Sequence, residues 1–154
     1  MNKSDFEIRK ASQSDMAEVA RVFRASFRHA LPYIPELHSP IEDHSYFTDV
    51  VFSRNHVFVA CGKATGSIVG FIAFSETMVD HLYLSAPVTG LGLGVQLLDL
   101  AKAQSSKLQL WAFQRNEIAK RFYIKNGFVI VRQTDGAGNE ENEPDFLFEW
   151  NRSD

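Results

Sequence analysis

The chain has 154 residues, of which 45% are hydrophobic and 13 are phenylalanine, so it is long enough to bury one sizeable core and short for two. We therefore expect a single domain over residues 1–154. The net charge is −3, and acidic and basic residues are interspersed without a basic stripe, which disfavours a nucleic acid as a partner.

The sequence shows no targeting signal and no disulfide framework. No signal-like apolar segment stands at the N-terminus, and no apolar stretch is long enough to span a membrane. Cys61 is the single cysteine, so it cannot form an internal disulfide. We expect a cytoplasmic protein with no membrane partner. The oligomeric state stays open, and a homodimer is one of the alternatives.

The N-terminal third predicts a strand and two helices. Residues 6–10 alternate between polar and apolar side chains and predict a short strand. Ser12 is of the residue type that caps helices and predicts that a helix follows. Its apolar face, expected to lie against a sheet, consists of Met16, Val19, Ala20, Phe23 and Phe27. Two prolines predict a loop over residues 31–39, and Pro40 predicts the first turn of a second helix, with Phe47, Val50 and Val51 inward.

Three strand-like runs follow, rich in β-branched and aromatic side chains, at residues 56–61, 67–74 and 78–84. A short turn with a glycine at each end separates the first two runs and predicts a hairpin. The third run continues this antiparallel meander.

The C-terminal half predicts alternating helices and strands. We expect a helix over residues 95–103, a strand over 107–113, a helix over 116–124 that ends at Asn126-Gly127, and a strand pair over 128–132 and 146–150. The whole order predicts an α/β (α+β) fold, with a mixed, mostly antiparallel central sheet of about seven strands and with four helices.

The most informative segment is Thr89-Gly90-Leu91-Gly92-Leu93-Gly94, between a strand and a helix. Its glycines allow the backbone to approach a ligand closely, and the first N–H groups of a helix have no partner within the helix. The helix dipole adds partial positive charge. The segment therefore predicts an anion cradle for a cofactor that carries a pyrophosphate. The alternative is that the glycines only allow a tight turn.

Two other phosphate-binding loops do not fit this segment. The nucleoside triphosphate loop ends in Gly-Lys-Ser/Thr, which the segment lacks. The dinucleotide fingerprint needs Gly-x-Gly-x-x-Gly near the start of a parallel sheet, whereas the spacing here is Gly-x-Gly-x-Gly after predicted antiparallel strands. Neither a nucleoside triphosphate nor a dinucleotide is therefore the expected ligand.

The element order and the glycine segment resemble the GCN5-related N-acetyltransferase (GNAT) superfamily over nearly the whole chain. The family motif Gln/Arg-x-x-Gly-x-Gly/Ala is matched at its fixed positions by Thr89, Gly92 and Gly94. Thr89 departs from the usual Gln or Arg, and Leu91 replaces a residue that is often basic. The family's strand-five and helix-four signature is similar to Leu110-Trp111-Ala112-Phe113 followed by Asn116, Ala119, Phe122, Tyr123 and Asn126-Gly127-Phe128.

The resemblance implies acetyl-coenzyme A as the cofactor. The implied cofactor-binding residues are Leu82, Tyr83, Leu84, Thr89, Gly90, Leu91, Gly92, Leu93, Gly94, Val95, Asn116, Ala119, Phe122 and Tyr123. In this family the strand that carries Leu82 and Leu84 splays from its neighbour at a bulge, and the N–H groups of Leu82 and Tyr83 would hold the pantetheine and polarise the thioester. Asn116 would bond the pantetheine, and Tyr123 would protonate the departing thiolate. The alternative for Tyr123 is core packing beside Phe122.

The base that takes the amine proton has three candidates, Glu76, Asp80 and His81. Because side chains alternate along a strand, Asp80 and His81 are expected to face opposite sides, so that only one faces the acceptor. Histidine has the ordinary pKa closest to neutral pH, which favours His81. The alternatives are that His81 packs against a helix, and that an amine with a lowered pKa needs no base.

The resemblance also implies an acceptor groove between the loop joining the first two helices and the loop joining the last two strands. The predicted substrate-binding residues are Phe27, Tyr33, His38, Glu141 and Glu143. Facing carboxylates favour a cationic amine, whereas the alternative is a solvated acidic turn. No metal is predicted, because His38, Glu42 and His44 lack a metal-binding spacing.

The sequence thus predicts an N-acetyltransferase that transfers an acetyl group from acetyl-coenzyme A to a primary amine of a small molecule or peptide. Two alternatives remain. One is a non-catalytic acyl-coenzyme A sensor module, and the other is a protein N-terminal acetyltransferase.

Overall fold

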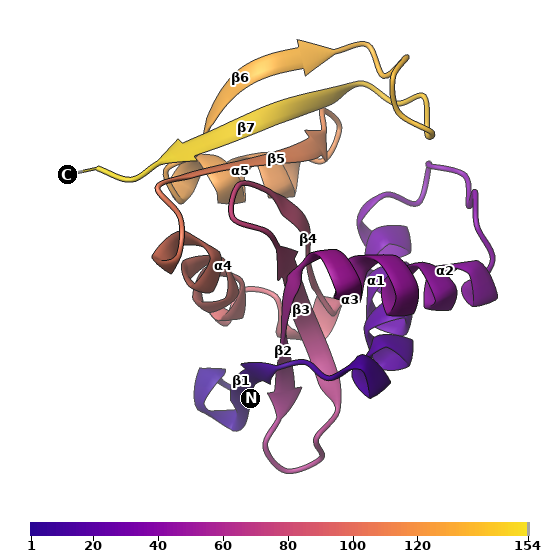
Figure 1. The fold of residues 1–154 in the computed structure, drawn as a ribbon, viewed down its shortest axis with the longest axis vertical. Coiled ribbons are helices and arrows are strands. Elements are labelled where there is room, and N and C mark those ends of the chain that lie inside the picture. The colour runs from indigo at the N-terminus through magenta and orange to yellow at the C-terminus, as the bar shows by residue number, and fades with distance from the viewer. Residues whose placement is uncertain (154) are drawn as a thin grey trace.

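The computed structural model describes residues 1–153 (Figure 1). The strands are β1 (Phe6–Lys10), β2 (His56–Gly62), β3 (Ile68–Phe74), β4 (Val79–Leu84), β5 (Lys107–Phe113), β6 (Val129–Thr134) and β7 (Asp145–Asn151). The helices are α1 (Met16–Ala30), α2 (Pro40–Tyr46), α3 (Phe52–Arg54), α4 (Leu93–Ala103) and α5 (Glu117–Lys125), with a π-helical turn over Phe47–Val51 joining α2 to α3. The order of elements predicted from the sequence is confirmed.

Two helix starts differ from the sequence prediction. Ser12 caps a 3₁₀ turn over Gln13–Asp15 that leads into α1, so it does not cap α1 itself. Helix α4 begins at Leu93, two residues earlier than expected, because Gly92 takes a left-handed conformation and serves as the N-cap. The second helix starts as expected, with Pro40 in its first turn. Ser39 is the N-cap: its hydroxyl accepts the Glu42 N–H, and the Glu42 carboxylate accepts the Ser39 N–H.

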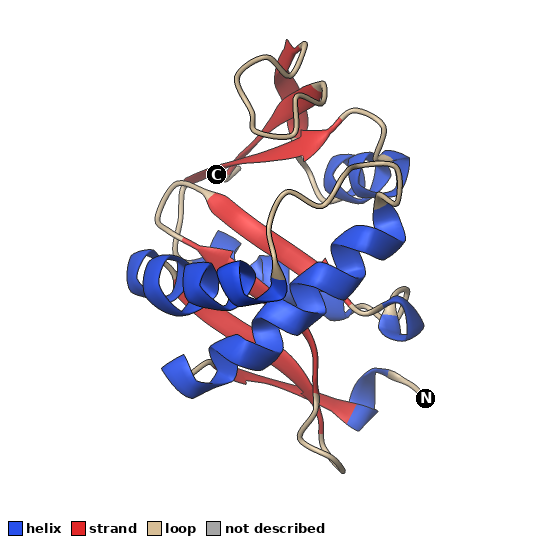
Figure 2. Cartoon of the chain, turned by 90° about the vertical axis from the view of Figure 1, so that its right-hand side faces the viewer, coloured by secondary structure: helices blue, strands red, loops and turns tan. Residues whose placement is uncertain are grey.

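The first sheet is antiparallel with strand order β1-β2-β3-β4, and helices cover both of its faces. Alternate residues of β2 and β3 enter different cores, as the two-residue period of a strand requires. Ala60 and Ile72 pack with α4, whereas Val59 and Phe71 pack with α1 and the π-helical turn. Figure 1 shows α4 and α1 on opposite sides of this sheet, and Figure 2 shows a long helix crossing it.

The second sheet has the order β5-β7-β6 and is also antiparallel. The expected seven strands are therefore divided between two sheets. Within residues 1–153, one isolated parallel bridge, Met78 to Gln109, joins them, with the Gln109 N–H donating to the Thr77 carbonyl at 2.9 Å. Beyond this bridge β4 and β5 diverge, and the space between them becomes the cleft described below.

One core spans both sheets. Leu97 and Leu98 of α4 belong to the same buried cluster as Phe148 of β7 and Tyr123 of α5. Cys61 is buried in the other core, under α1. No helix within the described chain is long and apolar enough to cross a membrane.

Candidate active site

The glycine segment has the geometry of an anion site. Gly90 and Gly92 have φ angles of 82° and 90°, which glycine adopts without a Cβ penalty. Among the described residues, no acceptor lies within hydrogen-bond distance of the N–H groups from Gly90 to Val95. A Cβ at Gly90 would meet no atom within 4 Å, so this surface is open. The segment therefore presents unpaired donors at the positive end of α4.

The side chains around this segment are used differently from the family pattern. The Thr89 hydroxyl donates to the Ala86 carbonyl at 2.9 Å and closes the preceding turn. The Lys3 stem lies against the segment, since a Cβ on Gly92 would lie 3.4 Å from its Cδ. Phe122 packs against Gly94 and fixes α5 to the start of α4. Sequence reasoning missed Lys3, because only the folded chain brings the N-terminus to the glycine segment.

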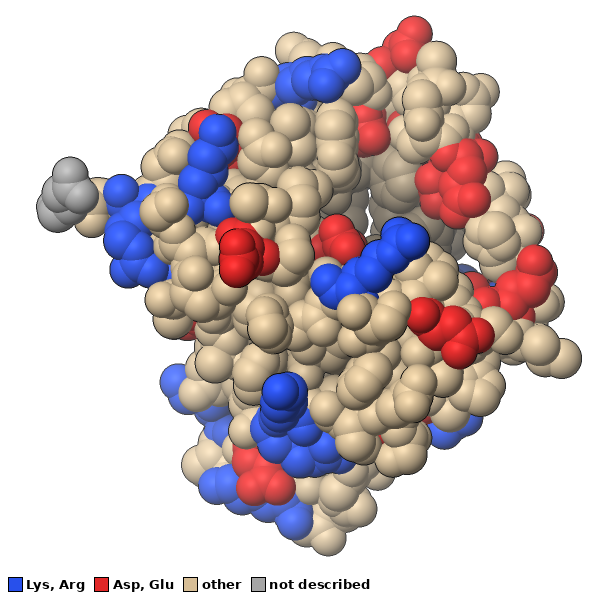
Figure 3. All heavy atoms as spheres, viewed as in Figure 1, with Lys and Arg blue, Asp and Glu red and all other residues tan. Residues whose placement is uncertain are grey.

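A cleft of about 720 Å³ separates β4 from β5. Its wall includes Asp80, His81, Leu82, Tyr83, Asn116, Ala119, Tyr123 and Glu141. Figure 3 shows a hollow in the surface near the β6–β7 loop with acidic side chains beside it. The structure thus brings together most of the residues that the sequence assigned to the pantetheine and to the chemistry.

Strand β4 presents unpaired N–H groups to this cleft. The Ser85 N–H donates to the Val69 carbonyl at 2.7 Å, and hydrogen-bonded pairs alternate along an antiparallel ladder. The N–H of Tyr83 therefore points to β3, while those of Leu82 and Leu84 point towards β5. The sequence analysis expected the N–H groups of Leu82 and Tyr83 to face the cleft. The structure agrees for Leu82, but the second N–H group is that of Leu84, because the sequence could not define how β4 pairs with β3.

The expected bulge is present in β4. Ala73 pairs with His81 and Phe74 with Val79, so Asp80 is the extra residue. Asp80 and His81 both contribute to the cleft wall, so the strict alternation expected for them fails at the bulge. Glu76 lies before β4 and lines neither of the two main cavities; its carbonyl accepts a hydrogen bond from the Ser105 hydroxyl.

His81 is enclosed by aromatic rings. Its ring lies 5.1–6.3 Å, between centroids, from five aromatic side chains, Phe23, Tyr46, Phe47, Phe71 and Tyr83. Its Nδ1 is buried without a hydrogen-bond partner in the described chain. Burial lowers the pKa of His81 to about 4, so the imidazole is neutral at pH 7 and is a weak base.

Tyr123 packs in the core and also reaches the cleft. Its side chain packs against Phe128 and Phe148, with ring centroids 5.6 and 5.7 Å away, and the residue is 8% exposed. It also lines the cleft. Burial raises the pKa of its hydroxyl, so Tyr123 keeps its proton at neutral pH. A protonated phenol on the cleft wall is a competent acid for a leaving thiolate.

Asn116 is both a helix cap and a cleft residue. Its side-chain oxygen accepts the Ala119 N–H at 3.1 Å, which caps α5 and fixes the side chain. The carboxamide nitrogen is left to donate into the cleft that Asn116 lines. This arrangement suits a polar group of an extended ligand.

A second cavity of about 490 Å³ adjoins the cleft on the acceptor side. It is lined by α1, the loop between α1 and α2, and the β6–β7 loop, including the predicted residues Phe27, His38 and Glu141. Tyr33 and Glu143 line neither cavity. Arg115 lies 3.7 Å from the centre of the Tyr33 ring and donates two 2.7 Å hydrogen bonds to the Glu143 carboxylate. Both residues therefore hold the loop in place.

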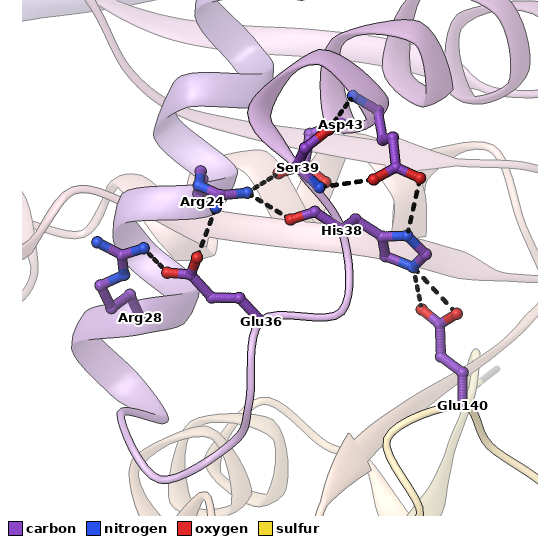
Figure 4. A network of polar contacts seen from close by, with 8 residues as sticks. Arg24, Arg28, Glu36, His38, Ser39, Asp43 and Glu140 are labelled. Carbon is purple, nitrogen blue, oxygen red and sulfur yellow. Dashed lines mark hydrogen bonds and ion pairs between the residues drawn. The ribbon is translucent and has the colours of Figure 1, made fainter.

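A polar network ties the acceptor loops together (Figure 4). His38 Nε2 lies 3.0 Å from the Glu140 carboxylate, across the two loops. Arg24 of α1 donates to the His38 carbonyl and to Asp43, both at 2.9 Å, and to Glu36 at 2.6 Å. Arg24 and Arg115 were missed from the sequence, because neither stands in a recognisable motif. In residues 1–153 no group of three His, Cys, Asp or Glu side chains could hold a metal.

The comparison with known families defines the class of this protein. Residues 53–130 match the family described as acetyltransferase (GNAT) domain. This stretch is about half of the chain and contains the glycine segment, β4, β5 and Tyr123. The chain belongs to the GNAT family of N-acetyltransferases.

Individual relatives agree with this assignment. The peptidyl-lysine N-acetyltransferase YiaC of Escherichia coli is 22% identical over 150 residues, which cover 93% of this chain and 95% of YiaC. A GCN5-related N-acetyltransferase from Rhodopseudomonas palustris superposes with a TM-score of 0.76 at 23% identity and 99% coverage of both chains. The PaiA N-acetyltransferase from Thermoplasma acidophilum, solved with coenzyme A, gives 0.72 at 22% identity, covering 96% of this chain and 99% of PaiA.

Proposed function

We propose that the protein uses acetyl-coenzyme A to acetylate a primary amine of a small molecule or a peptide. The observation that carries this proposal is that the cleft between β4 and β5 and the second cavity meet at Glu141. The glycine segment follows β4 in the chain and stands at the start of α4, whose unpaired N–H groups suit the phosphates of the cofactor. We also propose that residues 1–154 form one acetyltransferase domain, because relatives of similar length align over most of the chain.

The chain's donors fit this cofactor. The unpaired N–H groups from Gly90 to Val95 suit a diphosphate, and those of Leu82 and Leu84 suit the amide carbonyls of a pantetheine arm lying between β4 and β5. Asn116 adds a side-chain amide from the opposite wall. When bound, the cofactor supplies an acetyl group activated as a thioester.

The reaction needs a neutral amine, a polarised carbonyl and a proton for sulfur. The outward N–H groups of β4 polarise the carbonyl, and the Tyr123 hydroxyl donates the proton. Most acidic side chains of the second cavity are paired with Arg24, Arg28 or His38, so the cationic amine is attracted by Glu141. The name of the relative YiaC supports a peptidyl lysine as one form of this acceptor. A small-molecule amine and a protein N-terminus are the other forms.

The proposal is tested by calorimetry with acetyl-coenzyme A and by thiol release with a panel of amines, lysine peptides and peptides with a free N-terminus. Binding together with acceptor-dependent thiol release is expected. Binding without release for any acceptor would favour the sensor alternative. No binding at millimolar concentration would refute the cofactor assignment.

Tyr123→Phe tests the acid. The variant keeps the ring that packs in the core and loses only the hydroxyl, so we expect kcat to fall by about 10²-fold or more while the Kd for acetyl-coenzyme A stays within about twofold. Steady-state kinetics and calorimetry on the same preparation measure both quantities. Unchanged kcat would remove Tyr123 from the chemistry.

A further inference from the structure

Glu141 stands where the two cavities meet. Among residues 1–153 it is the one acidic residue that lines both the cleft between β4 and β5 and the acceptor cavity. An acceptor amine that enters from the second cavity must pass this carboxylate to reach the cleft. The sequence placed Glu141 only among substrate-binding residues, and the candidates for the base were all near β4.

The neighbouring acidic side chains are already engaged. Glu140 pairs with His38, and Glu143 pairs with Arg115. Asp145 accepts hydrogen bonds from the Thr134 hydroxyl and from the Asn139 amide. No Lys, Arg or His within ion-pair distance of Glu141, and no side chain hydrogen-bonded to it, occurs in the part of the chain that the structure describes.

The surroundings of Glu141 make it a better proton acceptor than an exposed glutamate. Burial raises the pKa of its carboxyl above the ordinary 4.5, and the charges of Glu140 and Asp145 raise it further. A contact with its own N–H and the charge of His38 act in the opposite direction. Glu141 and Tyr83 line the same cleft, and the pKa of the Tyr83 hydroxyl is raised by burial and further by the charge of Glu141.

The other candidates are less suited. His81 is surrounded by aromatic rings that disfavour its protonated form, and Glu76 lines neither cavity. Asp80 lines the cleft but is exposed and lies outside the acceptor cavity. Of these candidates, Glu141 is the carboxylate that lines both the acceptor cavity and the cleft between β4 and β5.

We propose that Glu141 is the general base of the acetyl transfer and that it selects amines that arrive as ammonium ions. This inference rests on the proposed function. The carboxylate accepts one proton from the ammonium, directly or through a water. The amine nitrogen then bonds to the acetyl carbon as the carbon–sulfur bond breaks. The sulfur takes the Tyr123 proton, Tyr123 regains a proton from the new amide nitrogen, and Glu141 releases its proton to solvent.

The test is the pH profile of wild type and Glu141→Gln with two synthetic peptides. One peptide has a free N-terminal amine with a pKa of about 7.7–8.0, and the other has a blocked N-terminus and one lysine with a pKa of about 10.4. At pH 7 we expect kcat to fall by about 10²-fold or more in the variant, with the Kd for acetyl-coenzyme A within about twofold. The limb that reports ionisation of the Glu141 carboxyl is lost, and in the variant the rate instead rises about tenfold per pH unit up to the pKa of each amine, so the two peptides give different profiles.

Three further variants make the result specific. Glu141→Asp is expected to keep the acid limb at a reduced rate. Glu117→Gln, on an exposed carboxylate of α5 that lines neither cavity, is expected to behave as wild type. The inference would be overturned if Glu141→Gln kept the wild-type limb, the same for both peptides, or if that limb disappeared instead in Asp80→Asn. Wild type that binds no acetyl-coenzyme A would refute the proposed function itself, and the inference with it.

Discussion

At the glycine segment, the side chain that the family motif assigns to the phosphates faces elsewhere. Thr89 is bonded to the Ala86 carbonyl, and Leu91 carries no charge. Backbone N–H groups can still bind a diphosphate without these side chains, because the left-handed glycines expose them. Lys3, whose stem packs on Gly92, supplies a cation to this segment from a distant part of the sequence.

Lys3→Gln is expected to weaken acetyl-coenzyme A binding by about 3- to 10-fold, because one charge-assisted phosphate contact in an exposed site is worth about 1 kcal/mol. The loss should shrink at high salt, and kcat at saturating cofactor should not change. Calorimetry at low and high ionic strength measures the effect. Lys10→Gln on β1 is the matched control, and equal effects of the two substitutions would contradict a local role for Lys3.

The positions of site residues could be predicted where they depend on the spacing of residues close together in the sequence. Tyr123 and Asn116 follow from motif spacing, and the structure places both at the cleft. The functions of Tyr33 and Glu143 could not be predicted, because both depend on Arg115, which only the tertiary fold brings between them. The second β4 donor was assigned to Tyr83 instead of Leu84, because register depends on pairing with β3.

At the scale of elements, the two acceptor loops behave as one unit. The loop after α1 and the loop after β6 are joined by His38 with Glu140 and by Tyr33, Arg115 and Glu143. The order of helices and strands could be predicted because it depends on short-range periodicity. The link between the loops could not, since its partners are about a hundred residues apart in the sequence.

This link is expected to depend on pH. Glu140 accepts a hydrogen bond from His38 and raises the pKa of its imidazole above the ordinary 6.5. The pair therefore stabilises the fold fully below pH 6.5, and the contribution is lost as pH rises through the raised pKa. His38→Gln should lower the free energy of unfolding by about 0.2–1 kcal/mol at acidic pH and not at alkaline pH, as measured by urea titration. A difference that does not vary with pH would contradict an ionic link.

At the scale of the molecule, the core shared by the two sheets supports Tyr123, the residue proposed as the acid. Phe148 is fully buried in β7 and contacts the Tyr123 ring. The division into two sheets could not be predicted, because strand patterns do not reveal where neighbouring strands part. The cleft exists because β4 and β5 part after a single bridge.

Phe148→Ala is expected to lower the free energy of unfolding by about 3–5 kcal/mol, and also to lower kcat in the protein that remains folded, because the Tyr123 ring loses a neighbour. The matched control is Met16→Ala in the other core, which should cost about 2–5 kcal/mol and leave kcat unchanged. Urea titration and kinetics at low temperature separate the two effects. Equal kcat in both variants would show that Tyr123 does not depend on Phe148.

Within the described residues, the bridge between Met78 and Gln109 is the one backbone pairing between β4 and β5, and the shared core holds the two sheets together beyond it. A pantetheine arm lying between β4 and β5 would form hydrogen bonds with both strands, in place of the backbone pairing that they lack there. The cofactor would then join the two strands as well as carry the acetyl group. The two halves should therefore move more independently once the acyl carrier has left than while it is in place. Product release and stiffness would then be linked, because each departing coenzyme A removes hydrogen bonds that join β4 to β5.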